Sequence, residues 1–143
     1  MAAEPPRRPD RQRGSSLMLM PAAVLVFVIL GAFAVDFAAV HLGQRELVAA
    51  AQGAANDAAV SGFSNAAFYE QGEVRFDPAG ARRAAAASLA ASDPEYVLRS
   101  VRIVDGAVVV EVEATVPTIF AKAVPGGPNT FIVDARATAD LDQ

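Results

Sequence analysis

Residues 17–35 constrain this chain more than any other stretch, because they carry no charged or strongly polar side chain. As an α-helix rising about 1.5 Å per residue, they cover roughly 28 Å, which is about the thickness of a bilayer hydrocarbon core. A single apolar run can satisfy its backbone hydrogen bonds in hydrocarbon only as a helix. The sequence therefore predicts a transmembrane helix over residues 17–35, despite Pro21 and Gly31 within it.

The charges on either side of this run predict its orientation. Four arginines precede it: Arg7, Arg8, Arg11 and Arg13. No Lys or Arg follows it before Arg45, so the positive-inside rule places the N-terminus in the cytoplasm and everything from Asp36 onward outside. Arg13 and Asp36, the last charge before the apolar run and the first one after it, then mark the two membrane boundaries. A carboxylate such as Asp36 costs about 2.5 to 3.5 kcal/mol at the bilayer centre, so it is expected at the edge. We expect Asp36 to face water rather than a basic group on a neighbouring subunit.

A cleaved signal peptide is the alternative to a retained anchor. Ala32-Phe33-Ala34 resembles a signal-peptidase site, and it follows a basic and then an apolar segment. However, the apolar cores of signal peptides are usually about 7 to 15 residues long. This run is longer and continues directly into helix-forming sequence, so we expect the helix to remain attached.

The rest of the chain has room for one small domain. Of 143 residues, 1–16 form a Pro- and Arg-rich segment that we expect to be a disordered cytoplasmic tail. From residue 36 onward there are 14 acidic and 8 basic residues, and this balance argues against a nucleic-acid partner. The chain has no cysteine, which excludes disulfides and thiolate metal ligands.

Residues 36–62 are expected to continue the helix outside the membrane as far as Gly62, a plausible C-terminal cap. Small residues follow one another at helical spacing, and they would let another backbone approach closely: Ala50, Ala51, Ala54, Ala55 and Ala58. Two interpretations stay open and are compatible. The helix covers the sheet of its own domain, or it packs against helices of other subunits.

Residues 63–143 are expected to form a small α+β domain. Asp77-Pro78 is a typical helix start, with the carboxylate as N-cap and Pro at the first helical position, and it predicts a second helix over residues 79–91. Asp93-Pro94 ends that helix, because the residue before a proline is pushed out of the helical region.

The apolar period then changes from about 3.6 to 2, which indicates strands. Two alternating runs flank Asp105-Gly106, a strong hairpin signal, and a third strand is predicted over residues 130–141. In the first run we expect Val97, Val101 and Ile103 to share one face. Three antiparallel strands with one apolar face need a helical cover, so we expect the second helix and the outer half of the first to pack on the sheet.

Few residues suggest catalysis. His41 is the sole histidine, so neither a His pair for a metal nor a Ser-His-Asp arrangement is available within one chain. Glu111 and Glu113 could form a carboxylate pair, but alternation places both on the polar face of a strand. No phosphate-binding loop or dinucleotide motif occurs. We expect no enzyme activity, no cofactor, no metal and no small-molecule substrate.

The order of motifs from Arg13 to Gly62 resembles a known family. The chain reads Arg13-Gly14-Ser15-Ser16, an apolar span with Pro21, Val35-Asp36, Gln44-Arg45-Glu46-Leu47 and Ala54-Ala55-Asn56-Asp57-Ala58-Ala59. This order is similar to that of the TadE/TadG-like minor pilins, or pseudopilins, of Flp/Tad (tight adherence) pilus assembly. The resemblance implies a single-pass protein of the bacterial inner membrane with a pilin-like fold, and pilin-like or pilus-assembly subunits as partners.

The resemblance also implies a processing site. Some pseudopilins are cut by a prepilin peptidase after a glycine, and Gly14 followed by Ser15 is the matching position here. This chain departs from the pattern at Leu19, where processed pilins often have Glu. An uncut TadG-like anchor would need no such Glu.

We therefore expect a membrane-anchored structural component of Flp/Tad-type pilus assembly that acts by helix packing with pilin-like subunits. The alternative is an anchored extracytoplasmic module that binds a ligand or the cell envelope.

Overall fold

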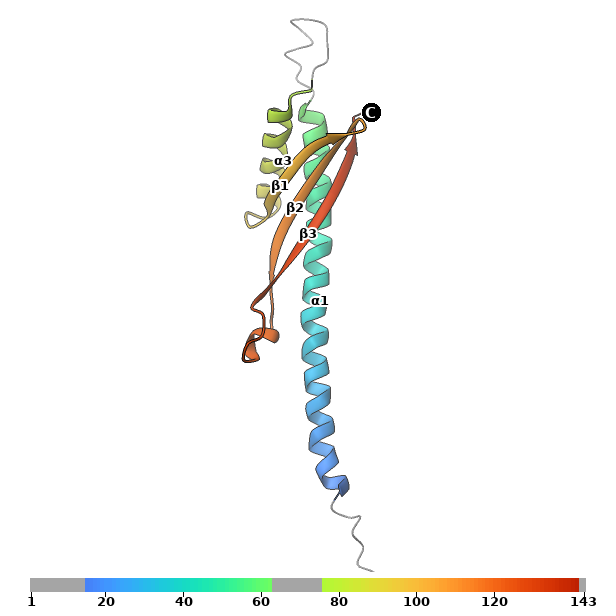
Figure 1. The fold of residues 1–143 in the computed structure, drawn as a ribbon, viewed down its shortest axis with the longest axis vertical. Helices are drawn as coiled ribbons and strands as arrows, with labels where there is room; N and C mark the ends of the chain where they lie inside the picture. Colours follow the sequence, from blue (N-terminus) through green and yellow to red (C-terminus); the bar gives the residue numbers. More distant parts are fainter. Residues whose placement is uncertain (1–14, 63–75, 142–143) are drawn as a thin grey trace, which may run out of the picture.

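A computed structural model describes residues 15–62 and 76–141, without the side chains of residues 15–18. Its elements are α1 (Ser15–Gly62), α3 (Pro78–Ser92), β1 (Val97–Val104), β2 (Ala107–Pro117), the short 3-10 helix η1 (Ala121–Ala123) and β3 (Thr130–Asp140) (Figure 1). The predicted combination of a long apolar N-terminal helix, a second helix and a three-stranded antiparallel sheet is confirmed, and the fold class is α+β. The predictions for the tail, Arg13 and Gly14 lie outside the described residues.

Helix α1 runs for 48 residues without a break, and Pro21 and the three internal glycines do not interrupt it. At about 1.5 Å per residue it is roughly 72 Å long. Its N-terminal part extends beyond the rest of the fold (Figure 1), and large apolar side chains between Leu19 and Val35 are 44% to 75% exposed there. Within the described part of the chain, α1 is the one helix long and apolar enough to cross a membrane.

The sheet has the strand order β1-β2-β3, with both neighbouring pairs antiparallel. Asp105 and Gly106 join β1 to β2 with φ values of 51° and 77°, as a two-residue turn with two left-handed positions requires. Helix α1 packs on β2 and β3, while α3 lies beside α1 and reaches β1. Two helices therefore cover the apolar face of the sheet, as expected.

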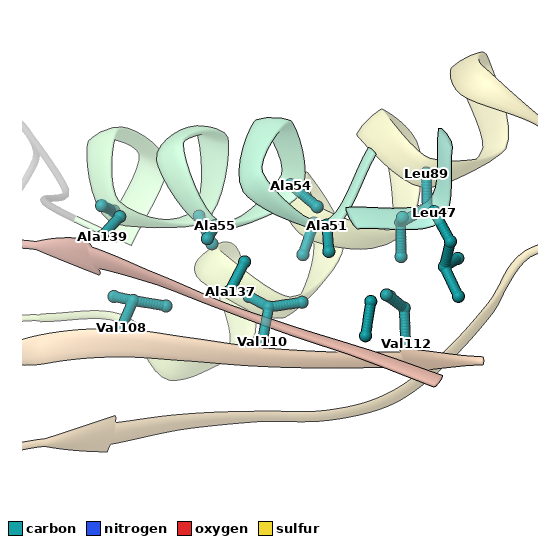
Figure 2. Packing of buried hydrophobic residues seen from close by; sticks show 14 of the residues in the cluster. Leu47, Ala51, Ala54, Ala55, Leu89, Val108, Val110, Val112, Ala137 and Ala139 are labelled. Carbon is teal, nitrogen blue, oxygen red and sulfur yellow. The ribbon is translucent and has the colours of Figure 1, made fainter. Parts of the chain in front are cut away.

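The core lies between α1, α3 and the sheet, and Figure 2 shows small side chains meeting larger ones across it. Alternate residues of β2 and β3 face α1 and are buried: Val108, Val110, Val112, Ala114, Val133, Ala135, Ala137 and Ala139. Opposite them, the buried side chains of α1 are alanines and one leucine, Leu47. The alanines allow α1 to lie close to the strands, and Leu47 and Leu89 fill the wider space.

The capping pattern of α3 is confirmed. The Asp77 side chain accepts a hydrogen bond from the Ala79 N–H at 2.9 Å, and Pro78 is the first helical residue. The helix ends at Ser92, and the N–H of Asp93 donates to the carbonyl of Leu89. Ala81, Ala85 and Leu89 form its buried face.

The predicted face of β1 is wrong in part. The pairing with β2 shifts between Leu98 and Ser100, so that Arg99 is an extra residue in a β-bulge. The bulge changes the alternation, and Leu98 and Val101 face the core, whereas Val97 is 47% exposed. Ile103 is also 46% exposed, because it lies near the end of an edge strand.

Candidate functional site

Asp36 joins α1 to the connection between β2 and β3. Its side chain is only 6% exposed, so the expectation that it faces water is wrong. Oδ1 accepts hydrogen bonds from the backbone N–H groups of Ile119 at 2.7 Å and Phe120 at 2.9 Å, and Oδ2 accepts one from Ala121 at 2.6 Å. Three successive amides at the start of η1 thus surround one carboxylate, which is how backbone groups bind an anion at a helix N-terminus.

The β2–β3 loop, residues 118–129, is also held from within. Thr118 is 2% exposed; its N–H donates to the Asn129 carbonyl at 2.9 Å and its hydroxyl donates to the Pro128 carbonyl at 2.8 Å. Near the end of β2, α1 approaches so closely that a Cβ on Gly43 would lie 2.7 Å from a methyl group of Val116. The loop therefore has a fixed position against α1, and Asp36 is the polar contact that sets it.

The Asp36 carboxyl has a pKa below its ordinary value of 3.8. The N–H of Phe120 contributes most to this lowered pKa, the amides of Ile119 and Ala121 and the positive charge of Lys122 act in the same direction, and burial opposes them. The charged carboxylate is thus the form that binds the loop.

This pKa predicts how docking of the loop depends on pH. Because the pKa is lowered in the folded state, the stabilisation is fully present above the unfolded value near 3.8, and it is lost as the pH falls through the folded pKa. We expect the NMR chemical shifts of the Ile119, Phe120 and Ala121 amides to stay constant at neutral and mildly acidic pH and to move only in strong acid. A titration of these shifts near neutral pH would contradict this assignment.

Two apolar grooves lie on either side of the Asp36 contact. The first has a volume of about 280 Å³ and is lined by α1 residues that include Ile29 and Phe33, and by loop residues that include Phe120 and Val124. The second, of about 270 Å³, lies between Phe37 and Val40 of α1 and Phe131 of β3, among others. Both grooves are nearly free of polar atoms apart from Asp36, so neither offers groups for acid-base or metal chemistry.

The alanines predicted to mediate helix packing have partners within the chain. Ala51, Ala54, Ala55 and Ala58 are fully buried in the core formed with α3 and the sheet, and Ala50 is partly buried against it. Covering the chain's own sheet accounts for these five side chains. The four fully buried alanines have no surface left for a second chain, so contact with another subunit requires other residues.

Ala54→Leu is expected to destabilise the fold rather than to report on subunit contacts. The added atoms have no space in a closely packed core, and such overpacking typically costs about 1 to 3 kcal/mol. Thermal unfolding of the detergent-solubilised protein, followed by the loss of near-UV circular dichroism, would measure this. Ala49→Leu is the matched control, because Ala49 is exposed on the same helix and its replacement should change the transition little. Equal transitions for the two variants would contradict the burial of Ala54.

The two glutamates of β2 lie on the sheet face away from α1, as predicted, and each has its own partner. Glu113 forms a two-point ion pair with Arg99 at 3.0 and 2.6 Å. Glu111 accepts a hydrogen bond from the Ser100 hydroxyl at 2.7 Å and pairs with Arg102; the Ser100 bond contributes most to a lowered pKa of Glu111. A lowered pKa is the opposite of what a general acid needs.

The remaining candidate site residues do not come together in one site. His41 is exposed on α1, and across residues 15–62 and 76–141 no group of three or more His, Asp or Glu side chains is arranged to hold a metal ion. Ser15, which directly follows the predicted cleavage position after Gly14, is the first residue of α1.

No protein-family model, curated protein or solved structure matches this chain. The fold and the Asp36 contact are therefore the features that point to a function. Sequence reasoning missed this contact because its donors are backbone amides, which no residue type reveals. The one available signal was an acidic residue placed directly after an apolar run.

Proposed function

We propose that this chain is a membrane-anchored structural component of a pilus-assembly system of the Flp/Tad type, similar to the TadE/TadG-like minor pilins. In this proposal it crosses the bacterial inner membrane once, with the N-terminus in the cytoplasm. The sheet domain, which consists of α3, the three strands and the part of α1 that packs on them, lies outside. The observation that carries the proposal is the division of α1. Its N-terminal half is apolar and exposed, whereas one face of its C-terminal half is buried under α3 and the sheet of the same chain.

An exposed apolar helix of this kind needs lipid or protein around it, because contiguous apolar surface of this extent is unfavourable in water. One face of the exposed half also fits close helix packing. Gly31, Ala34 and Ala38 follow at spacings of three and four, are exposed, and lie on the side of α1 opposite Asp36. In membranes, small residues at this spacing let a second helix approach closely. We assign the contact with pilin-like subunits to this face.

Co-purification tests the proposed partners. The full chain, extracted in mild detergent from the membranes of cells that contain the pilus system, should retain pilin-like subunits. Ala34→Leu should lose them, because the larger side chain separates the two helices. Ala49→Leu, exposed further along the same helix, should retain them. A chain that is monomeric in detergent and indifferent to Ala34→Leu would overturn the packing role and favour the anchored binding module instead.

The mass and N-terminal sequence of the membrane-bound protein test the processing step. A start at Met1 or Ala2 corresponds to an uncut anchor in the membrane. A start at Ser15 corresponds to cleavage after Gly14 by a prepilin peptidase and to a subunit able to enter a filament. A start at Val35 would overturn the anchor, because it leaves only a secreted domain.

A further inference from the structure

The β2–β3 loop is unusually apolar for a surface loop. Residues 117–133 contain a single charged side chain, Lys122. Five large apolar side chains in and beside the loop are 42% to 69% exposed: Ile119, Phe120, Val124, Phe131 and Ile132. The segment between β2 and β3 lies at the end of the sheet that extends furthest toward the N-terminal half of α1 (Figure 1). This surface is next to the exposed apolar half of the helix, and the two are continuous.

The α1 residues beside the β2–β3 loop indicate how deep the loop would lie in a bilayer. The groove of about 280 Å³ lies between the loop residues Phe120 and Val124 and the α1 residues Ile29 and Phe33. Ile29 precedes Asp36 by seven residues, which is about 10 Å along a helix. Since Ile29 and Phe33 belong to the apolar segment 17–35, the loop lies beside the last two turns of that segment.

The backbone of the loop is suited to an apolar environment. In hydrocarbon an unsatisfied N–H costs several kcal/mol, so non-helical backbone is rare at that depth. Here three N–H groups donate to Asp36, and those of Thr118, Ala123, Val124 and Gly127 donate to carbonyls of the loop. Pro125 and Pro128 have no N–H at all. Seven of the ten backbone N–H groups of residues 118–129 are therefore paired, and this lowers the cost of placing the loop in hydrocarbon.

We propose that the β2–β3 loop inserts into the membrane leaflet nearest the sheet domain, and that a phospholipid acyl chain fills the groove between the loop and α1. Lys122 is exposed, and a lysine side chain is long enough for its ammonium group to reach the phosphate groups from this depth. The loop and α1 then form two points of contact with the bilayer, which fix the tilt and rotation of the sheet domain above it. This inference depends on the membrane anchoring in the proposed function.

Fluorescent probes test the insertion directly, because the chain has no cysteine and single substitutions give specific labelling. Three exposed valines are matched sites: Val28 in the apolar half of α1, Val124 in the loop, and Val104 at the opposite end of the sheet. Each Val→Cys variant of the full chain carries a polarity-sensitive dye. The variants are reconstituted at high lipid excess into vesicles of phosphatidylethanolamine and phosphatidylglycerol. Some vesicles also contain phosphatidylcholine with a nitroxide near the headgroup end of one acyl chain, which reports on the depth of the loop, and others contain phosphatidylcholine with the nitroxide near the chain end, which reports on position 28.

The expected result is emission at shorter wavelength and strong nitroxide quenching for the dye at position 124, as for position 28, with neither change at position 104. Quenching at position 28 without quenching at 124 would overturn the insertion of the loop and leave the anchor intact. No quenching at either position would overturn the anchor and this inference together. A blue-shifted but unquenched dye at 124 would identify a protein occupant, such as a second copy of the chain, and would overturn the lipid assignment.

Discussion

Asp36→Ala is expected to release the β2–β3 loop from α1. The substitution removes the acceptor of three backbone N–H groups at once, and no other described side chain bonds to them. Leaving these partly buried donors without acceptors should increase amide exchange at Ile119, Phe120 and Ala121 by about tenfold to a hundredfold. Hydrogen exchange of the full chain in detergent micelles, read by NMR or mass spectrometry, measures the change.

Two further variants define what Asp36 contributes. Asp57→Asn removes a carboxylate from an exposed position on the same helix, and exchange in the loop should not change. Asp36→Asn keeps an oxygen for Ile119 and Phe120 but turns an NH₂ group toward the N–H of Ala121. Its effect should therefore be strongest at Ala121. Unaltered exchange in Asp36→Ala would contradict the role of this contact.

Leu47→Ala is expected to destabilise the domain by about 2 to 5 kcal/mol, which is typical for the truncation of a fully buried leucine. Leu47 is 0% exposed, and the other buried apolar side chains of α1 are alanines. The neighbouring side chains are short and attached to rigid helices and strands, so the cavity left behind cannot close readily. Exchange of the slowest amides of β2, such as Val108, Val110 and Val112, should rise by roughly thirtyfold or more, the equivalent of 2 kcal/mol or above.

Val48→Ala is the matched control for that prediction. Val48 is the next residue of the same helix and is 47% exposed, so its truncation removes few contacts. We expect a change of about 0.5 kcal/mol or less in β2 exchange. Similar effects for Leu47 and Val48 would mean that α1 does not pack on the sheet in the way described.

Local patterns in the sequence predicted the secondary structure well. The Asp77-Pro78 start of α3 and the Asp105-Gly106 turn are confirmed, because capping and tight turns depend on residues close in the sequence. The alternation in β2 correctly placed Glu111 and Glu113 on the face away from α1, but Ala107 and Val109 on that same face are buried as well. In β1 the same reasoning failed at Arg99, because a bulge depends on how two strands pair and not on the period of one of them.

The Asp36 contact could not be predicted in the same way. Its three donors are 83 to 85 residues away and belong to the backbone, so neither a motif nor a spacing marks them. The alanines of α1 are an intermediate case. Their spacing predicted close packing, but the choice between the chain's own sheet and another subunit depended on where α3 and β2 lie.

The sequence by itself determined an apolar helix long enough for a bilayer, a second capped helix and three alternating strands. Each of these follows from the period of apolar side chains or from the conformational limits of Pro, Gly and Asp. Only the tertiary structure decided that Asp36 is buried and that the apolar loop lies beside the end of the apolar segment of α1. The physical reason is that these contacts join backbone groups and apolar surfaces far apart in the chain, and they form only once α1 packs against the sheet.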